Sequence, residues 1–182
     1  MYGRRPYTLH MSQTKKVTLS ATVAALSAVF LVIGGYLDVF DLTASALASL
    51  LVAFVHVEIG KPYDFLVWLI TSLVTFLFGS LLWAQYLLVF GIYPILKAYI
   101  ERLPRGVWIF LKLLFINLML WSIMAVYEFI FKIPFFVVDK LWVKVGVYFV
   151  LNVGFIAYDL FITVLMRFYF ERFRNRIKHL LK

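Results

Sequence analysis

The sequence predicts an all-α integral membrane protein: a bundle of six transmembrane helices with both termini on the inner side. Hydrophobic residues make up 64% of the 182 positions and charged residues only 15%, and mean hydropathy is +0.95. The charged residues also divide the chain into long apolar blocks. A soluble domain of this size has too little interior for so much apolar surface, so we expect the remainder to face lipid.

The first two apolar blocks predict two helices after a basic inner tail, residues 1–16. Residues 17–36 carry no charge and are long enough to cross a hydrocarbon core of about 30 Å at about 1.5 Å per residue. The second helix, predicted over 42–58, is shorter and lies between Asp41 and Glu58. It can cross only if its ends snorkel or the bilayer thins.

The next uncharged stretch, residues 65–96, is too long for one upright helix and is predicted to hold two. Gly79 and Ser80 near its middle provide a turn, and Gly91 and Pro94 loosen the second half. We therefore expect helices over 62–79 and 81–100. The last two apolar blocks predict helices over 106–131 and 141–166.

The placement of positive charge supports six helices rather than five. With six helices and an inner N-terminus, 14 of the 18 Lys and Arg residues lie on the inner side, as the positive-inside rule requires. They are Arg4, Arg5, Lys15, Lys16, Lys61, Lys97, Arg102, Arg105, Arg167, Arg172, Arg174, Arg176, Lys178 and Lys182. Lys112 can snorkel inward as well, while Lys132, Lys140 and Lys144 remain outside. This bias also accounts for the net charge of +9 better than nucleic-acid binding does.

The last segment, 167–182, is predicted to be a cytoplasmic amphipathic helix bent onto the inner membrane surface. Its apolar residues share one helical face and basic residues occupy much of the rest; the apolar set is Phe170, Phe173, Ile177, Leu180 and Leu181. An ordinary basic flank of the sixth span remains the alternative.

Residue types that carry catalysis or hold metal ions do not form a pattern in this chain. There is no cysteine, and His10, His56 and His179 lie far apart without metal-ligand spacing. Phosphate-binding, nucleophile-elbow and zinc-protease motifs are absent from the sequence. We therefore expect a protein that is not an enzyme and needs no metal or cofactor.

Small residues recur at intervals of four in the first predicted helix, as Ala21-x3-Ala25 and Ala24-x3-Ala28. Such stripes allow two helix backbones to approach closely, which favours association within lipid. The second helix repeats the pattern with Ala44-x3-Ala48. Two interpretations stay open: the stripes pack the first helix on the second, or they dock another membrane protein.

The topology and the stretch KKVTLSATVAALSA, residues 15–28, resemble the substrate-binding S component of energy-coupling factor transporters. The resemblance implies a subunit for micronutrient uptake at the cell membrane. It also implies that the alanine stripes dock to a coupling transmembrane subunit energised by two ATPases, and that a small-molecule nutrient binds in the outer half beneath the first loop.

The resemblance selects six residues as candidates for such a binding site. They are Asp38, Asp41, Trp83, Gln85, Glu128 and Asn152. The two aspartates and nearby aromatic rings favour a neutral or cationic, ring-bearing nutrient. Alternatively, the aspartates only cap the second helix.

Other polar and aromatic residues within the spans are expected to have structural roles. We expect Glu128 to pair with Lys132 four residues later, and Asp159 to take an internal hydrogen bond, for which Asn117 is one partner. His56 and Glu58 are interpreted as a water-exposed inner end of the second helix. Trp68 and Trp121, which lie well inside spans, are expected to pack in the core.

Two further function classes compete with the transporter subunit. One is a scaffold or assembly subunit of a membrane complex, such as a cell-shape protein of the MreD type, and the absence of a polar cluster at mid-membrane favours it. The other is a membrane enzyme or channel. The acidic first loop with the outer Trp83 and Gln85 favours the transporter subunit.

Overall fold

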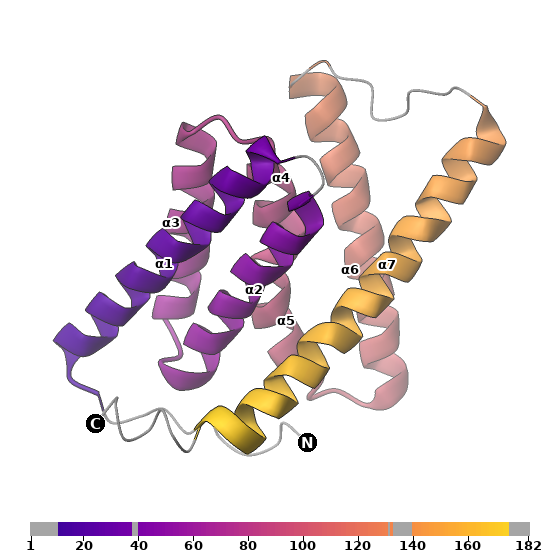
Figure 1. The fold of residues 1–182 in the computed structure, drawn as a ribbon. Helices are drawn as coiled ribbons and strands as arrows, with labels where there is room; N and C mark the ends of the chain where they lie inside the picture. Colours follow the sequence, from indigo (N-terminus) through magenta and orange to yellow (C-terminus); the bar gives the residue numbers. More distant parts are fainter. Residues whose placement is uncertain (1–10, 38–39, 131, 133–139, 175–182) are drawn as a thin grey trace.

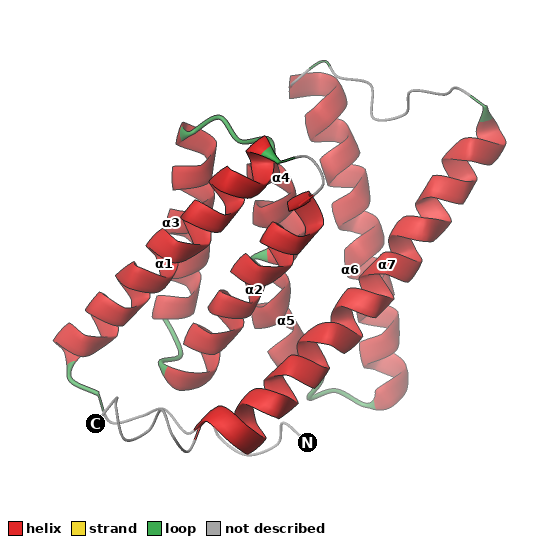
Figure 2. Cartoon of the chain, viewed as in Figure 1, coloured by secondary structure: helices red, strands yellow, loops and turns green. Residues whose placement is uncertain are grey.

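The computed structural model describes residues 11–37, 40–130, 132 and 140–174, and these residues form helices and short connections without any strand (Figures 1 and 2). Four helices are long and apolar enough to cross a membrane: Gln13–Tyr36, Asp41–Glu58, Arg105–Ile130 and Leu141–Arg172. A fifth apolar helix, Tyr63–Leu77, is shorter, with 15 residues. The all-α membrane-protein class predicted from composition agrees with this architecture.

Helices α1 (Gln13–Tyr36), α2 (Asp41–Glu58) and α3 (Tyr63–Leu77) pack together in the first half of the chain (Figure 1). The hydroxyl of Ser12 accepts a hydrogen bond from the Lys15 amide at 3.4 Å, which satisfies one of the free donors at the start of α1. The bounds of α1 and α2 lie within a few residues of the predicted helices.

Small residues form the contact between α1 and α2. The buried face of α1 includes Ser20, Val23, Ala24, Ser27, Ala28, Leu31 and Gly34. On α2, Ala44, Ser45, Ala48 and Ser49 are buried. A Cβ atom added to Gly34 would overlap the Cβ atom of Ala44. The two helices therefore approach so closely at this point that glycine is required.

The predicted break within residues 65–96 is confirmed. Helix α3 ends at Leu77, and Gly79 adopts a φ of +69°, a left-handed conformation that suits glycine. The chain then continues through α4 (Leu82–Gln85), the π-helical segment η2 (Tyr86–Phe90) and α5 (Tyr93–Ile100). Pro94 lies in the first turn of α5, where its missing N–H costs no helical hydrogen bond.

The second half of the chain consists of two long helices. Helix α6 (Arg105–Ala125) continues into the π-helical segment η3 (Val126–Ile130), and α7 (Leu141–Phe168) continues into η4 (Tyr169–Phe173). The helical backbone therefore runs past the boundary predicted at residue 167. Most of the predicted amphipathic helix, 175–182, lies outside the described residues.

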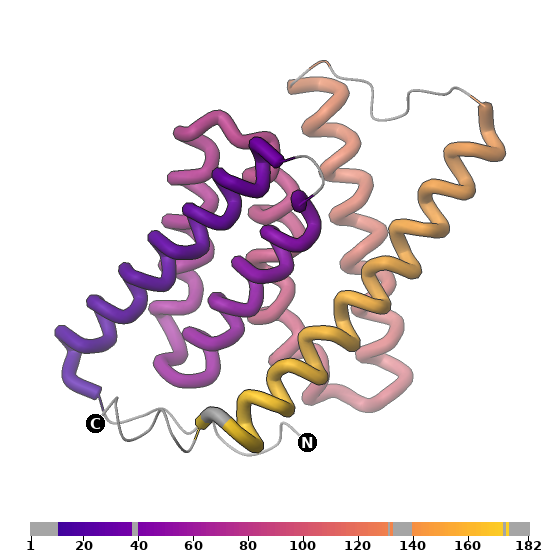
Figure 3. Tube along the Cα trace, in the orientation of Figure 1, coloured from indigo at the N-terminus to yellow at the C-terminus, as the bar shows by residue number. Residues whose placement is uncertain are grey.

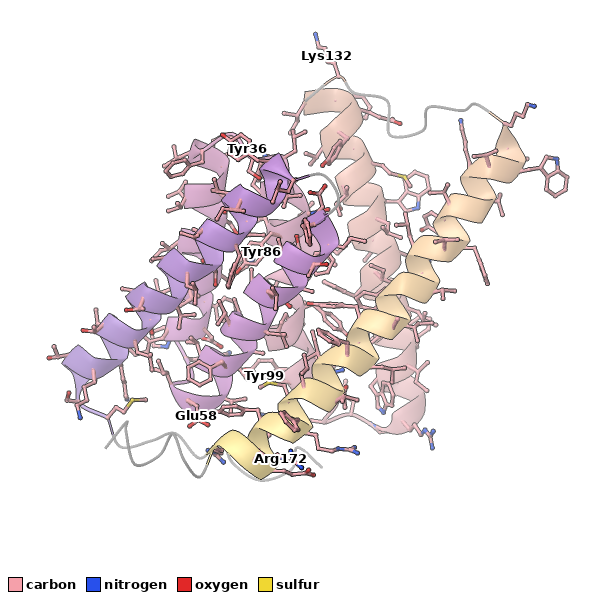
Figure 4. The ribbon with its side chains drawn as sticks, in the orientation of Figure 1. Tyr36, Glu58, Tyr86, Tyr99, Lys132 and Arg172 are labelled. Atoms are coloured by element: carbon pink, nitrogen blue, oxygen red, sulfur yellow. The ribbon has the colours of Figure 1, made fainter. Side chains whose placement is uncertain are left out.

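The last residues of η3 and the first residues of α7 lie apart from each other at one end of the bundle (Figure 3). Tyr36 and Lys132 mark this end, called the Tyr36 end here, whereas Glu58, Tyr99 and Arg172 mark the opposite, Glu58 end (Figure 4).

Two groups of buried apolar side chains form the core. One joins α1, α2, α3 and α4, around Leu31, Val52 and Val67. The other joins α2, α5, α6 and α7, around Tyr93, Phe115 and Phe155. Trp68 packs against the first group, as expected. The expectation for Trp121 is wrong: its side chain is 69% exposed, because it lies on a face of α6 that no neighbouring helix covers.

We predict that Gly34→Ala destabilises the protein. The added methyl group must push α1 away from Ala44, and overpacking of this kind costs about 1–3 kcal/mol. Gly146→Ala is the matched control, because a Cβ atom there meets no atom within 4 Å and alanine favours the helix by about 0.5–1 kcal/mol. Thermal unfolding in detergent measures the stability of both variants. Equal midpoints for the two variants would contradict the close contact.

Candidate functional site

Four charged side chains gather where α5, α6 and α7 meet. Asp159 of α7 pairs with Lys97 of α5 and with Lys112 of α6, whose Nζ atom lies 2.9 Å from Asp159 Oδ2. Glu101 completes the cluster, 3.1 Å from Lys97 and 2.7 Å from Lys112. Both lysines are buried, being 3% and 6% exposed. Two positive and two negative charges therefore balance inside the protein.

Helical spacing brings the residues of this cluster together. Tyr93, Lys97 and Glu101 follow one another at intervals of four along α5 and therefore lie on one face. The Tyr93 hydroxyl donates a hydrogen bond to Asp159 Oδ1 at 2.5 Å. The internal hydrogen bond expected for Asp159 is therefore present, but its partners are Tyr93 and the two lysines and not Asn117. Lys112, expected to snorkel, is held among these carboxylates instead.

A second buried ion pair connects the end of α2 to the end of α7. Glu58 is fully buried, and its Oε1 atom accepts hydrogen bonds from Arg174 Nε at 2.9 Å and from the Tyr169 hydroxyl at 3.0 Å. The interpretation of Glu58 as a water-exposed helix end is therefore wrong. A carboxylate buried in this way requires such donors, because its desolvation would otherwise be costly.

Polar and aromatic side chains also line the rim of the Glu58 end. His56 Nδ1 lies 2.7 Å from the buried Asp64 carboxylate. The exposed Tyr99 ring has Lys61 Nζ at 4.6 Å and the Arg102 guanidinium at 5.2 Å from its centroid. Hydrogen bonding to Tyr99 raises the pKa of Lys61 above its ordinary value. This rim is thus cationic and aromatic.

The residues predicted to bind a nutrient occupy separate environments. Asp38 lies outside the described residues. Asp41 is the first residue of α2, after Phe40 at the N-cap. Trp83 packs edge-on against Phe76, with ring centroids 5.1 Å apart. Gln85 donates a hydrogen bond to Ser45 at 3.1 Å, which connects α4 to α2.

The other two predicted binding residues lie on α7 and at the end of α6. Glu128 is exposed within η3. The helix ends at Ile130, and no ion pair joins Glu128 to Lys132 among the described residues, so the expected pair does not form. Asn152 accepts a hydrogen bond from Asn117 at 3.4 Å and donates one to the Tyr148 carbonyl.

Two cavities in the described part of the chain lie elsewhere. One is about 20 Å³, room for roughly one water molecule, and lies beside His56 and Lys97. The other is an open groove of about 380 Å³ between α6 and α7. The described members of the predicted nutrient site line neither cavity.

The two alanine stripes of α1 have different surroundings. Ala24 and Ala28 are buried, being 3% and 5% exposed, in the contact with α2 and α3. This agrees with the internal-packing interpretation at those positions. Ala21 and Ala25 are exposed on the other side of the helix. A docking role therefore remains available to this second stripe alone.

The buried ionic cluster is the site that sequence reasoning missed. Two signals indicated it: Lys112 and Asp159 are opposite charges within apolar blocks, and Lys97 precedes Glu101 by four residues. Their pairing could not be assigned, because three different helices contribute. Among the described residues, no group of three or more His, Cys, Asp or Glu side chains could hold a metal ion.

Comparison with known proteins finds no match to this chain among family models, curated proteins or solved structures.

We predict that Asp159→Asn destabilises the protein by about 3 kcal/mol or more, because two buried lysines then share a single carboxylate. Glu128→Gln is the matched control, since that carboxylate is exposed at the other end of the bundle. Titration with a denaturing detergent measures the resistance of both variants to unfolding. If Asp159→Asn unfolded at the same detergent fraction as the control, the cluster would contribute nothing to stability.

Proposed function

We propose that this chain is a multi-pass protein of the cell membrane with six spans and both termini inside. The interrupted segment α4–η2–α5 and the short α3 count as spans in this proposal, together with the four longer helices. The Glu58 end is then the inner side. The positive charge of that rim, where Lys61, Arg102 and Arg172 lie, supports this orientation.

The proposed role is that of a non-catalytic subunit that works by docking to a partner in the membrane. The observation that carries this proposal is the exposed face of α1, where Thr18, Ala21, Thr22 and Ala25 present small side chains. Exposed faces of α3 and α6 carry large residues such as Leu73, Phe76 and Phe110. On α1 the small residues lie among the larger exposed side chains Val17, Leu26 and Val29. Small residues on a lipid-facing helix permit close approach of a second backbone.

In its more specific form, the proposal makes the chain the substrate-binding subunit of a micronutrient uptake transporter similar to the energy-coupling factor type. The resemblance of residues 15–28 supports this form, because the exposed Ala21 and Ala25 belong to that stretch. The partner would be the coupling subunit with its two ATPases. No cofactor or catalytic chemistry is required of this chain.

A scaffold or assembly subunit is the second candidate, and the cavities favour it. A nutrient pocket usually encloses about 300–1,000 Å³, whereas the cavity beside His56 is about 20 Å³. The larger groove is open and lies away from the first loop. Both candidates require the same docking face on α1 but differ in whether a soluble ligand binds.

We predict that a cysteine introduced at Ser12 is protected from membrane-impermeant maleimide in intact cells, whereas one at Lys132 is labelled. The chain has no cysteine of its own, so each variant carries a single reporter, and both positions are exposed. Labelling of the Ser12 variant from outside would overturn the proposed orientation. Permeabilised cells provide the control that both thiols can react.

We predict that Ala25→Leu weakens co-purification of the membrane partner at least tenfold while the thermal stability of the isolated subunit changes little. The added side chain points away from the core and separates the two backbones.

Ala24→Leu is the matched comparison, one position away on the buried face. There the same change is expected to destabilise the subunit itself, by about 1–3 kcal/mol. Unchanged partner recovery with Ala25→Leu would show that the exposed stripe faces lipid and would remove the basis of the docking proposal.

Paired Asp38→Asn and Asp41→Asn substitutions separate the two candidate roles. The transporter form predicts at least tenfold weaker binding of a cationic nutrient, because asparagine can still cap a helix but carries no charge. The scaffold form predicts that partner recovery is unchanged and that no binding is lost. Uptake and equilibrium binding measured with the same nutrient distinguish these outcomes.

A further inference from the structure

Two exposed cations share one aromatic ring at the Glu58 end, where Tyr99 is labelled in Figure 4. Lys61 lies in the connection between α2 and α3, and Arg102 follows α5. The Lys61 Nζ atom is 4.6 Å and the Arg102 guanidinium 5.2 Å from the centroid of the Tyr99 ring, and all three residues are exposed. Two connections that are far apart in the sequence therefore meet at this ring.

The acidic residues nearest to these two cations have other partners. Asp64 attracts Lys61, but it is fully buried and lies 2.7 Å from His56 Nδ1. Glu101, next to Arg102, pairs with the two buried lysines of the ionic cluster. Among the described residues, no ion pair joins Lys61 or Arg102 to a carboxylate. The ring between them attracts both cations without neutralising either.

The rest of this end of the bundle supplies little negative charge. Glu58 is paired with Arg174, and η4 carries one further acidic residue, Glu171, beside Arg172. Residues 1–16 and 175–182, which belong to the proposed inner side, contain basic residues but no Asp or Glu in the sequence. The like charges at Tyr99 are therefore left to complement an anion.

An apolar stripe runs along the exposed face of α3, away from these cations. Its members are Phe65, Leu69, Leu73 and Phe76, which follow at intervals of four, four and three and are between 36% and 57% exposed. Lys61 Nζ lies 5.5 Å from the Phe65 ring centroid, so the stripe begins beside a cation. The helix rises about 16 Å over these residues, which matches one leaflet of a hydrocarbon core of about 30 Å.

We propose that Lys61, Tyr99 and Arg102 bind the phosphate of an anionic phospholipid from the inner leaflet, with an acyl chain along the α3 stripe. The proposal rests on the orientation proposed above, in which the Glu58 end meets the negatively charged cytoplasmic surface. The ammonium group has three N–H donors and the guanidinium five, so donors remain beyond those that the ring contacts occupy. A phosphate beside both groups also relieves the repulsion between them.

The test measures lipid binding to the full-length protein in neutral detergent by native mass spectrometry. The probe is an equal mixture of phosphatidylglycerol and phosphatidylcholine with the same acyl chains, because the choline group brings a positive charge of its own. One Lys or Arg near an anionic surface favours binding about fivefold, so we expect a preference for phosphatidylglycerol of about 25-fold. Lys61→Gln and Arg102→Gln should each reduce it about fivefold, and the double variant should abolish it.

The matched control is the double variant Lys16→Gln with Arg172→Gln, which removes the same charge from the proposed inner side and should retain the preference within about twofold. Tyr99→Leu keeps both cations but removes the ring that holds them together. We expect it to reduce the preference at least threefold, whereas attraction by net charge alone would leave it unchanged. Helical content measured by circular dichroism confirms that each variant is folded.

Equal retention of the two lipids by the wild-type protein would overturn the proposal. So would an equal loss of preference in the control pair and in the Lys61 and Arg102 pair, which would indicate diffuse attraction. Displacement of phosphatidylglycerol by the same concentration of glycerol 3-phosphate would show a site for a soluble phosphate instead of a lipid. Binding in detergent does not depend on orientation, whereas maleimide labelling at Ser12 tests orientation without lipid, so the two failures can be distinguished.

Discussion

The ion pairs of Asp159 with Lys97 and Lys112 are the interaction on which the second half of the structure depends. They connect α5, α6 and α7 at one level, whereas α6 and α7 lie apart at the Tyr36 end (Figure 1). A charge buried among apolar helices is tolerated where an opposite charge and hydrogen-bond donors meet it. The cluster therefore determines where these helices cross and leaves the α6–α7 groove open above them.

The same requirement shapes the first half of the molecule through hydroxyl groups as well as through the buried carboxylates of Glu58 and Asp64. Thr71 of α3 donates a hydrogen bond to the Ala24 carbonyl, and Ser80 in the turn after α3 donates one to the Leu31 carbonyl. Side chains from neighbouring segments thus bond to the backbone of α1. The small residues at Gly34 and Ala44 bring the backbones close enough for such contacts. Tight packing and polar satisfaction thus reinforce each other in this part of the bundle.

These two halves differ in how closely their helices pack. The helices of the first half are closely packed, and α1 still exposes Ala21 and Ala25, which suit a rigid docking surface. The α6–α7 groove is lined mainly by apolar and aromatic side chains and is open, in contrast to the close packing of the first half.

Much of the helical architecture could be predicted from the sequence, because it depends on residues close together in the chain. The length of each apolar block determined where helices form. Gly79 determined the turn between α3 and α4, since few other residues adopt its left-handed backbone conformation. The interruption near Gly91 and Pro94 is likewise a local property of glycine and proline.

Only the tertiary structure decided which side of each helix is covered and which partner each polar residue meets. Sequence alone could not choose between the stripes of α1, because Ala24 and Ala25 are equally small and differ only in the direction they face. It assigned Trp121 to the core and Asn117 to Asp159 for the same reason. The rotation and crossing of helices bring together residues that are far apart in sequence. The spacing of residues along one helix therefore does not reveal these contacts.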